Sequence, residues 1–215
     1  MLELKGVEYE LATVLPGTQR MHLRLVGFRG GTVPALKLDG RRVQGSRAIA
    51  RALEAARPDP PLFPTDEAAE RWGDEELQMA PRRIVRWGLT RDAGLRRWIS
   101  EASGVPAPGL VGALGLPAAK YYARAVGADE AAVRRALDEL PGMLARVDAL
   151  LADGVLTPKA PDAATLQVLC SVRALDGFAD LHDQVAAHPC AAPARELFPD
   201  YPEIPAFLSR SAAWA

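Results

Sequence analysis

Residues 7–11, VEYEL, alternate between apolar and acidic side chains along the start of the chain. A hydrophobic period of two is typical of a half-buried β-strand. Gly6 comes directly before this segment, in a place typical of a helix C-cap. We therefore predict a strand over residues 7–11 that follows the end of a helix.

The clearest local signals lie between residues 33 and 56. Val33-Pro34 is expected to start one strand, Asp39-Gly40 to form a tight turn, and Val43 to end a second strand. A helix capped by a serine is predicted next, with apolar residues on one face: Ser46, Ile49, Leu53 and Ala56. With a short helix expected over residues 19–28, these elements predict a small α/β unit ending near residue 57.

Prolines concentrate between residues 58 and 64, where they predict a stiff extended connector. The remainder is helical in pattern, because apolar residues recur there at spacings of three and four. We therefore divide the chain into an α/β domain (residues 1–57), a linker (58–64) and an all-α helical bundle (65–215).

Within the helical part, a helix is expected from Thr65 toward residue 91 with an interruption at Pro81. Residues 104–117 are rich in Gly and Pro and predict irregular backbone or a broken helix. Pro141 is expected to bend or restart the helix that carries it. A later helix should be capped by an aspartate and bury one apolar face, and an extended aromatic tail should follow: Asp162, Leu166, Leu169, Val172, and the tail from Leu197.

Composition indicates a soluble globular protein, for which the cytoplasm is the default location. The 215 residues are 49% hydrophobic and carry a net charge of -1. No apolar run approaches the roughly 20 residues that a membrane span needs, and the start has no signal-peptide pattern. Cys170 and Cys190 are the only cysteines and form no C-x-x-C pair, so neither a disulfide framework nor a dithiol redox site is expected.

The hairpin and the following helix also form a candidate binding site. An X-Pro bond can be locked in the cis form, which would turn the backbone N–H and C=O of Val33 outward, where a peptide-like ligand can pair with them. Free N–H groups at the helix that opens on Ser46 favour a carboxylate. A routine strand start and a simple helix cap remain the alternative interpretations.

This arrangement resembles the glutathione S-transferase family, in which a thioredoxin-like domain has a cis-Pro after a valine and a serine at the start of its third helix. The segments LELKGVEYEL, RPDPPLFP and DALLADGVLTPKAPDAATLQVL resemble further parts of the family, in the same order. The resemblance implies that glutathione is the co-substrate. Its site would comprise five residues: Val33, Pro34, Gln44, Gly45 and Ser46. Because Gly45 stands where the family commonly has an acidic residue or Gln, weak or altered thiol binding is expected.

The family pattern begins with a strand and a turn that hold the Tyr, Ser or Cys next to the glutathione sulfur, whereas this sequence resembles it only from the end of the first helix. Unpaired buried backbone groups cost about 1 to 3 kcal/mol each. We therefore expect a shortened reading frame, an incomplete thioredoxin-like domain, no assignable catalytic residue and little activity. The alternative is a reorganised sheet in which residues 7–11 pair directly with residues 33–38.

The resemblance also suggests where an electrophilic small molecule binds. Arg83 and Trp87 lie one helical turn apart and are expected at the cleft between the domains, with Tyr121 and Tyr122 as weaker candidates. For the aromatic residues, core packing is the alternative.

Other chemistry is not favoured by the sequence. Arginines interleave with tryptophans over residues 72–98, but the chain is not basic overall, so a nucleic-acid surface is not predicted. His182, His188 and Cys190 match no zinc spacing, and no metal is expected. Cys170 falls in an apolar stripe and is predicted to be an inert core residue.

Two functions remain open. The first is a glutathione transferase of the detoxifying type that joins the thiol of glutathione to an electrophilic small molecule. The second is a non-catalytic binding or assembly module with the same fold. The resemblance implies a homodimer in both cases.

Overall fold

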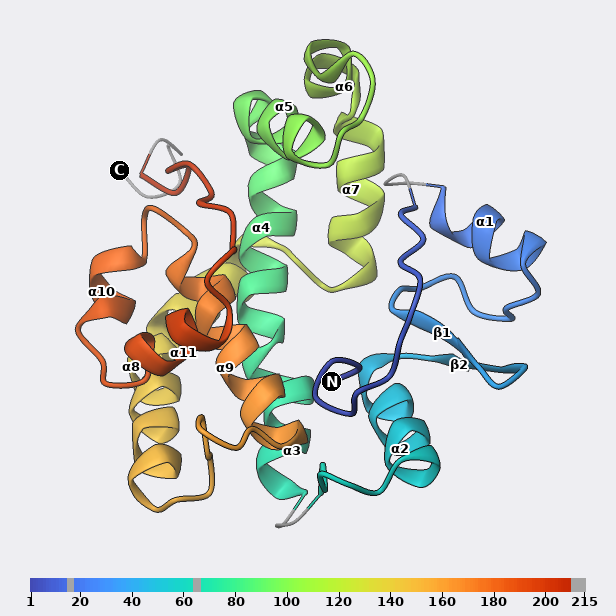
Figure 1. Cartoon of the computed structure of the whole chain (residues 1–215). Helices are drawn as coiled ribbons and strands as arrows, with labels where there is room; N and C mark the ends of the chain where they lie inside the picture. Colours follow the sequence, from blue (N-terminus) through green and yellow to red (C-terminus); the bar gives the residue numbers. More distant parts are fainter. Residues whose placement is uncertain (15–17, 64–66, 210–215) are drawn as a thin grey trace.

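The computed structural model describes residues 1–14, 18–63 and 67–209, so Pro64 of the predicted linker lies outside the described residues. Figure 1 shows a small N-terminal unit, which carries the two strands, beside a larger group of helices. Over the described ranges, no helix is both long and apolar enough to span a bilayer.

The N-terminal unit contains four regular elements, namely α1 (Gln19–Leu25), β1 (Ala35–Leu38), β2 (Arg41–Gln44) and α2 (Ser46–Ala56). The two strands are antiparallel, and Ala35 faces Gln44 across the ladder. Asp39 and Gly40 join the strands with φ angles of 47° and 81°. Positive φ at both central residues is what a two-residue hairpin turn requires, so the predicted hairpin is confirmed.

The first residues form one helical turn that closes at Gly6, which has a φ of 59°. The N–H of Gly6 donates to the carbonyl of Glu3 at 3.0 Å, and the N–H of Val7 donates to the carbonyl of Leu2 at 3.0 Å. These two bonds form a Schellman motif, so the C-cap predicted at Gly6 is confirmed.

The predicted strand over residues 7–11 is wrong, because this segment has no regular structure. Among the described residues the sheet consists of β1 and β2 alone, so direct pairing of residues 7–11 with residues 33–38 does not occur either. Tyr9 and Leu11 remain 45% and 83% exposed. Alternation alone does not make a strand, since a strand also needs a partner for its backbone groups.

The hairpin and the N-terminal turn pack on one face of α2. Ile49, Ala50 and Leu53 of α2 are buried there together with Leu62 and with Ala163 from the helical part. Leu36, Leu38 and Val43 of the hairpin cover this cluster and are half-buried.

Lys5 connects the N-terminal turn to α2 and to the connector that follows it. Its fully buried ammonium lies 2.5 Å from Glu54 Oε2 and donates to the carbonyls of Pro58 and Pro60. Glu54 Oε2 also accepts the N–H of Leu62 at 2.9 Å. Burial alone would raise the pKa of Glu54, but the hydrogen bonds from Lys5 and Leu62 and the charge of Lys5 lower it below its usual value.

The rest of the described chain is helical. Its elements are α3 (Ala68–Trp72), the π-helical turn η1 (Gly73–Leu77), α4 (Met79–Arg91), α5 (Ala93–Ala102), α6 (Pro108–Leu114), α7 (Leu116–Ala125), α8 (Glu130–Ala152), α9 (Ala163–Asp176), α10 (His182–Ala186) and α11 (Ala191–Leu197). Helix α4 packs against α7, α8 and α9 and runs through the middle of this group (Figure 1).

Several helix predictions need correction. The long helix expected up to residue 91 is divided by η1, and Pro81 lies in the first turn of α4, where its missing N–H removes no helix bond. Pro141 lies inside the continuous helix α8, so the predicted restart there is wrong. Residues 104–117 contain the short helix α6, in agreement with a broken helix.

Helix α9 is capped as predicted, because the carboxylate of Asp162 accepts the N–H of Thr165 at 2.8 Å. Its buried face includes Val168, Leu169 and Val172, while Leu166 is only half-buried. This buried face is therefore rotated slightly from the predicted one.

The C-terminal tail is extended and crosses the helices, as predicted. Ile204 forms a bridge with Phe178. The carboxylate of Asp180 accepts the N–H groups of Phe207 and Leu208 at 2.6 and 2.9 Å. Phe207 is buried against Gly88, whose hydrogen faces the ring where any larger side chain would collide with it.

Candidate functional site

A cleft of about 1230 Å³ separates the N-terminal unit from α4 and α7. One wall is formed by α1, the loop that leads into β1, and the start of α2; the other is formed by η1, α4 and α7. The described lining residues are Gln19, Arg20, Arg29, Gly30, Gly31, Thr32, Val33, Pro34, Gln44, Gly45, Ser46, Arg47, Ala48, Asp74, Arg82, Arg86, Tyr121, Tyr122, Ala125 and Val126. The cleft is large enough for a tripeptide-sized ligand.

Val33 and Pro34 form an open backbone edge in this cleft. The peptide bond between them is cis. Val33 is 55% exposed, and over the described part of the chain neither its N–H nor its C=O makes a hydrogen bond. Pro34 is tied into the hairpin, since its carbonyl accepts the N–H of Gly45 at 3.0 Å. A donor and an acceptor are thus available to a peptide-like ligand.

The start of α2 differs from the prediction in one respect. Gly45, with a φ of 88°, is the N-cap residue, and its carbonyl accepts the first helical bond from Ile49 at 2.9 Å. Ser46 is the first helical residue, and its side chain makes no capping bond. The amides of Ser46, Arg47 and Ala48 consequently have no acceptor within the helix, and all three residues line the cleft. Such a helix start attracts an anion.

Gln44 has a structural role that the sequence did not indicate. Its Oε1 accepts the N–H of Gly30 at 2.7 Å, and its Nε2 donates to the carbonyl of Thr32 at 3.2 Å. A Cβ at Gly30 would lie only 2.7 Å from Gln44 Oε1, so this contact needs a glycine. Gln44 therefore holds the loop that leads to Val33 against β2.

Arginines dominate the charge of the cleft. Arg47 is paired with Glu70 at 3.2 Å and with Glu75 at 3.5 Å. The other lining arginines have no carboxylate within ion-pair distance among the described residues: Arg20, Arg29, Arg82 and Arg86. Asp74 is the single acidic residue of the described lining. The cleft is thus electropositive although the chain as a whole has a net charge of -1.

The wall formed by α4 and α7 combines aromatic rings with positive charge. The rings of Tyr121 and Tyr122 lie edge to face with centroids 5.3 Å apart. The guanidinium of Arg86 stacks over Tyr122 at 5.0 Å. Both tyrosines predicted for the substrate pocket line the cleft, and their binding role stays a prediction.

Arg83 and Trp87 do not line the cleft, contrary to expectation. The Nε of Arg83 donates to the carbonyl of Val126 at 3.4 Å, and Trp87 is 2% exposed within the helical core. Arg82 and Arg86, each one position earlier, face the cleft in their place. A π turn such as η1 takes up one residue more than an α turn, which changes the side chains of α4 that face a given wall.

The histidines and cysteines lie elsewhere. His188 Nδ1 lies 2.6 Å from Asp148, whose other oxygen accepts the N–H of Cys190 at 2.8 Å. Burial and Asp148 together raise the pKa of the Cys190 thiol to about 12. The described residues hold no group of three His, Cys, Asp or Glu side chains arranged to bind a metal ion. Cys170 is exposed, so its predicted core position is wrong.

Comparison with known proteins supports the resemblance. Residues 1–56 match the family model of the glutathione S-transferase N-terminal domain. Neither a curated protein nor a solved structure gives a significant match to the chain. The matched segment contains the open edge at Val33 and the first turn of α2, and a mostly helical region follows it, as in the two-domain fold of the family. Residues 1–56 are therefore similar to the glutathione S-transferase N-terminal domain, and the short two-stranded sheet with the mostly helical remainder fits a thioredoxin-like part followed by a helical part.

Proposed function

We propose that this protein binds glutathione in extended form in the cleft and presents the thiol to an electrophilic small molecule. The observation that carries the proposal is the convergence, in one cleft, of the open backbone edge at Val33, the free amides that begin α2, and unpaired arginines. Each of these groups complements a different part of the tripeptide.

The ligand's backbone can pair with the N–H and C=O of Val33 in the manner of an added strand. One carboxylate of glutathione fits the amides of Ser46 to Ala48, where the helix dipole favours negative charge. Arg20 and Arg29 offer partners for the second carboxylate. Asp74 is available for the ammonium group, because the side chain of Gln44 is already engaged by the loop.

The electropositive cleft also suits the chemistry of the thiol. The thiolate is the nucleophilic form, and neighbouring arginines lower a thiol pKa because they stabilise the anion. In the transfer step the thiolate sulfur attacks an electrophilic carbon, an S–C bond forms, and the leaving group departs with its electron pair. The catalytic residue stays unassigned.

A binding or assembly module without catalysis is the second candidate. It is favoured by exposed apolar side chains along α1, where Met21 is 63% exposed and Leu25 is 79% exposed. Side chains of this kind suit contact with another chain. A homodimer, as the family usually forms, is the corresponding proposal for partners.

Isothermal titration with glutathione, followed by a conjugation assay with 1-chloro-2,4-dinitrobenzene, tests both candidates. Binding with a rate clearly above the uncatalysed one supports the transferase. Glutathione binding without catalysed conjugation supports the binding module. If glutathione does not bind at all, the proposal that it is the ligand is wrong. Arg29→Gln should weaken the binding of glutathione several-fold. Arg24→Gln is the control and should leave the affinity unchanged, because Arg24 is exposed on α1 and does not line the cleft.

A further inference from the structure

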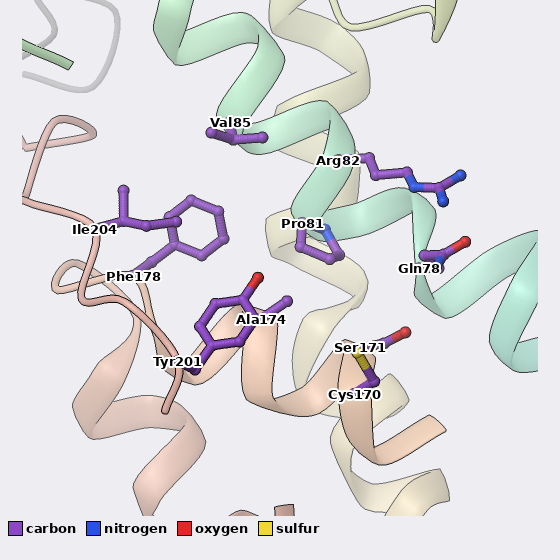
Figure 2. Close-up of a pocket in the computed structure, with 10 residues that line it drawn as sticks. All are labelled: Gln78, Pro81, Arg82, Val85, Cys170, Ser171, Ala174, Phe178, Tyr201 and Ile204. Atoms are coloured by element: carbon purple, nitrogen blue, oxygen red, sulfur yellow. The ribbon is translucent and has the colours of Figure 1, made fainter. Parts of the chain in front are cut away.

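Two arginines of the cleft are not needed for glutathione as placed above. Arg82 and Arg86 lie one turn apart on α4, and both line the cleft on the side of the helical region. Arg82 also borders a smaller pocket of about 200 Å³ between α4, α9 and the tail. Figure 2 shows its guanidinium directed away from Phe178 and Tyr201 in that pocket. The charge of Arg82 is therefore available to the cleft.

The arrangement of these two side chains is unfavourable without an anion. Like charges spaced by four residues destabilise a helix. Arg86 is in addition half-buried, with its guanidinium stacked on Tyr122. Burial lowers the pKa of Arg86; Tyr122 acts in the opposite direction, and the charge of Arg82 adds to the lowering. A bound anion would relieve both effects.

Two pairs of arginines elsewhere in the chain each share one buried carboxylate. Arg47 and Arg51 share the buried carboxylate of Glu70, and Arg173 and Arg195 share that of Asp176. Among the described residues, no carboxylate plays this part for Arg82 or Arg86. Within the described part of the chain, Arg82 and Arg86 therefore form a pair of neighbouring arginines without a counter-charge on this wall of the cleft.

We propose that Arg82 and Arg86 bind the carboxylate of the electrophilic co-substrate, and that this co-substrate is a flat aromatic acid lying against Tyr121 and Tyr122. Planar guanidinium groups bind carboxylates through two parallel hydrogen bonds, which fixes the orientation of an attached ring. The edge-to-face tyrosine pair provides an apolar surface for that ring. This inference rests on the proposed function for the thiol partner, but the acid site itself is independent of glutathione.

The reaction consistent with this site is displacement on an activated ring. The thiolate sulfur of glutathione attacks the ring carbon that bears a halide, the S–C bond forms, and the halide leaves with the electrons of the broken bond. The arginines hold the carboxylate at the other end of the ring and take no part in proton transfer. They are binding residues that orient the electrophile.

The test uses 4-chloro-3-nitrobenzoate and its uncharged counterpart 4-chloro-3-nitrobenzamide, titrated without glutathione so that no reaction occurs. The wild-type chain should bind the acid about ten-fold or more tightly than the amide, as expected for hydrogen bonds to a charged group. The double variant Arg82→Gln/Arg86→Gln should lose this preference and keep the affinity for the amide. Equal affinity of the wild type for acid and amide would overturn the proposal.

Arg83→Gln is the matched control, because Arg83 lies on the same helix but bonds to Val126 and does not line the cleft. It should keep the preference for the acid, and thermal unfolding should show that all variants are folded. Glutathione is titrated into the double variant separately. Unchanged glutathione affinity supports the assignment, whereas loss of glutathione binding with the acid preference intact assigns the pair to glutathione and overturns it. If the wild-type chain binds the acid but does not bind glutathione, the proposed function is wrong and the acid site is still supported.

Discussion

The N-terminal unit and the helical region differ in how much apolar surface they bury. The helical region has one continuous core from α3 to the tail, in which Ile84, Leu140 and Phe178 are almost fully inaccessible. The N-terminal unit buries only a small cluster around Leu53. It also carries most of the large apolar side chains that are exposed in the described chain: Tyr9, Leu11, Met21, Leu25, Val26 and Val33. A two-stranded hairpin with so small a core is marginal by itself.

The smaller unit consequently depends on contacts with the larger one. Ala163 of α9 completes its apolar cluster, and Arg47 and Arg51 of α2 pair with Glu70 of α3. The candidate site lies between the two regions, so a ligand that contacts both walls would also stabilise the weaker one. The difference between the two regions therefore implies that ligand binding in the cleft and the stability of the N-terminal unit are coupled.

The largest expected effect comes from Asp176 in the helical region. Its buried carboxylate accepts two hydrogen bonds from Arg195, at 2.6 and 2.9 Å, and one from Arg173 at 3.0 Å. Asp176→Asn should lower the free energy of unfolding by about 3–5 kcal/mol, because it leaves the arginines without their counter-charge. Urea denaturation should show both regions unfolding together, since contacts with the helical region stabilise the N-terminal unit. A change below about 1 kcal/mol would contradict this role.

The same residue predicts how stability depends on pH. Burial alone would raise the pKa of Asp176, but the hydrogen bonds from Arg195 and the charges of Arg195, Arg173 and His182 lower it. A carboxyl group with a lowered folded-state pKa stabilises the fold above its unfolded value, and this contribution is lost as pH falls through the folded value. The stability difference between wild type and Asp176→Asn should therefore be full at pH 7 and shrink below about pH 4. An undiminished difference at acid pH would contradict the assignment.

Leu53→Ala is expected to have a more local effect. Leu53 is fully buried in the small cluster, and truncation of a buried leucine costs about 2–5 kcal/mol. Because the N-terminal unit is the less stable region, its amides should exchange hydrogen much faster while those of α4 and α9 stay protected. Leu140→Ala, in the core of the helical region, is the matched control and should lower the protection of both regions. If Leu53→Ala lowered hydrogen-exchange protection equally throughout the chain, the proposed difference in stability between the two regions would be wrong.

Local signals account for the parts of the fold that the sequence predicted. The turn at Asp39-Gly40, the C-cap at Gly6 and the cap at Asp162 were all foreseen, because each depends on a few neighbouring residues. Residues 7–11 were predicted wrongly, because a hydrophobic period of two indicates only which side chains share a face. It does not indicate whether a neighbouring strand is present to pair with the backbone. The restart predicted at Pro141 does not occur, since a proline on an exposed helix face can be accommodated within a continuous helix.

The candidate site shows the same division. Val33 and the start of α2 were predicted from a local motif, and the structure brings them together in one cleft. Arg82 and Arg86 were missed because the side chains that α4 presents depend on the π turn before it, which the hydrophobic pattern does not reveal. The structural role of Gln44 was missed since its partners, Gly30 and Thr32, are defined only by the folded loop.

Glu54→Gln should weaken the connection between the N-terminal turn and α2. Without the carboxylate, the buried ammonium of Lys5 loses its counter-charge and keeps only neutral acceptors, among them the carbonyls of Pro58 and Pro60. We expect a loss of about 1–3 kcal/mol in the stability of the N-terminal unit, measured by hydrogen exchange of the hairpin. Glu8→Gln is the exposed control. The double variant Lys5→Met/Glu54→Gln should recover part of the loss, because no unpaired charge remains buried; full additivity would show that the two side chains do not interact.

Gln44→Ala is expected to have the smallest effect on stability and a clearer one on the site. It removes the hydrogen bonds to Gly30 and Thr32, which together contribute about 1 kcal/mol net. The loop before Val33 then loses its attachment to β2, so the ligand edge becomes less ordered and glutathione should bind several-fold more weakly, by isothermal titration. Arg41→Ala, an exposed change at the other end of β2, should leave binding unchanged. If Gln44→Ala lowered stability without any change in glutathione affinity, the ordered loop would have no part in binding, and the weaker region would serve the site only through α2.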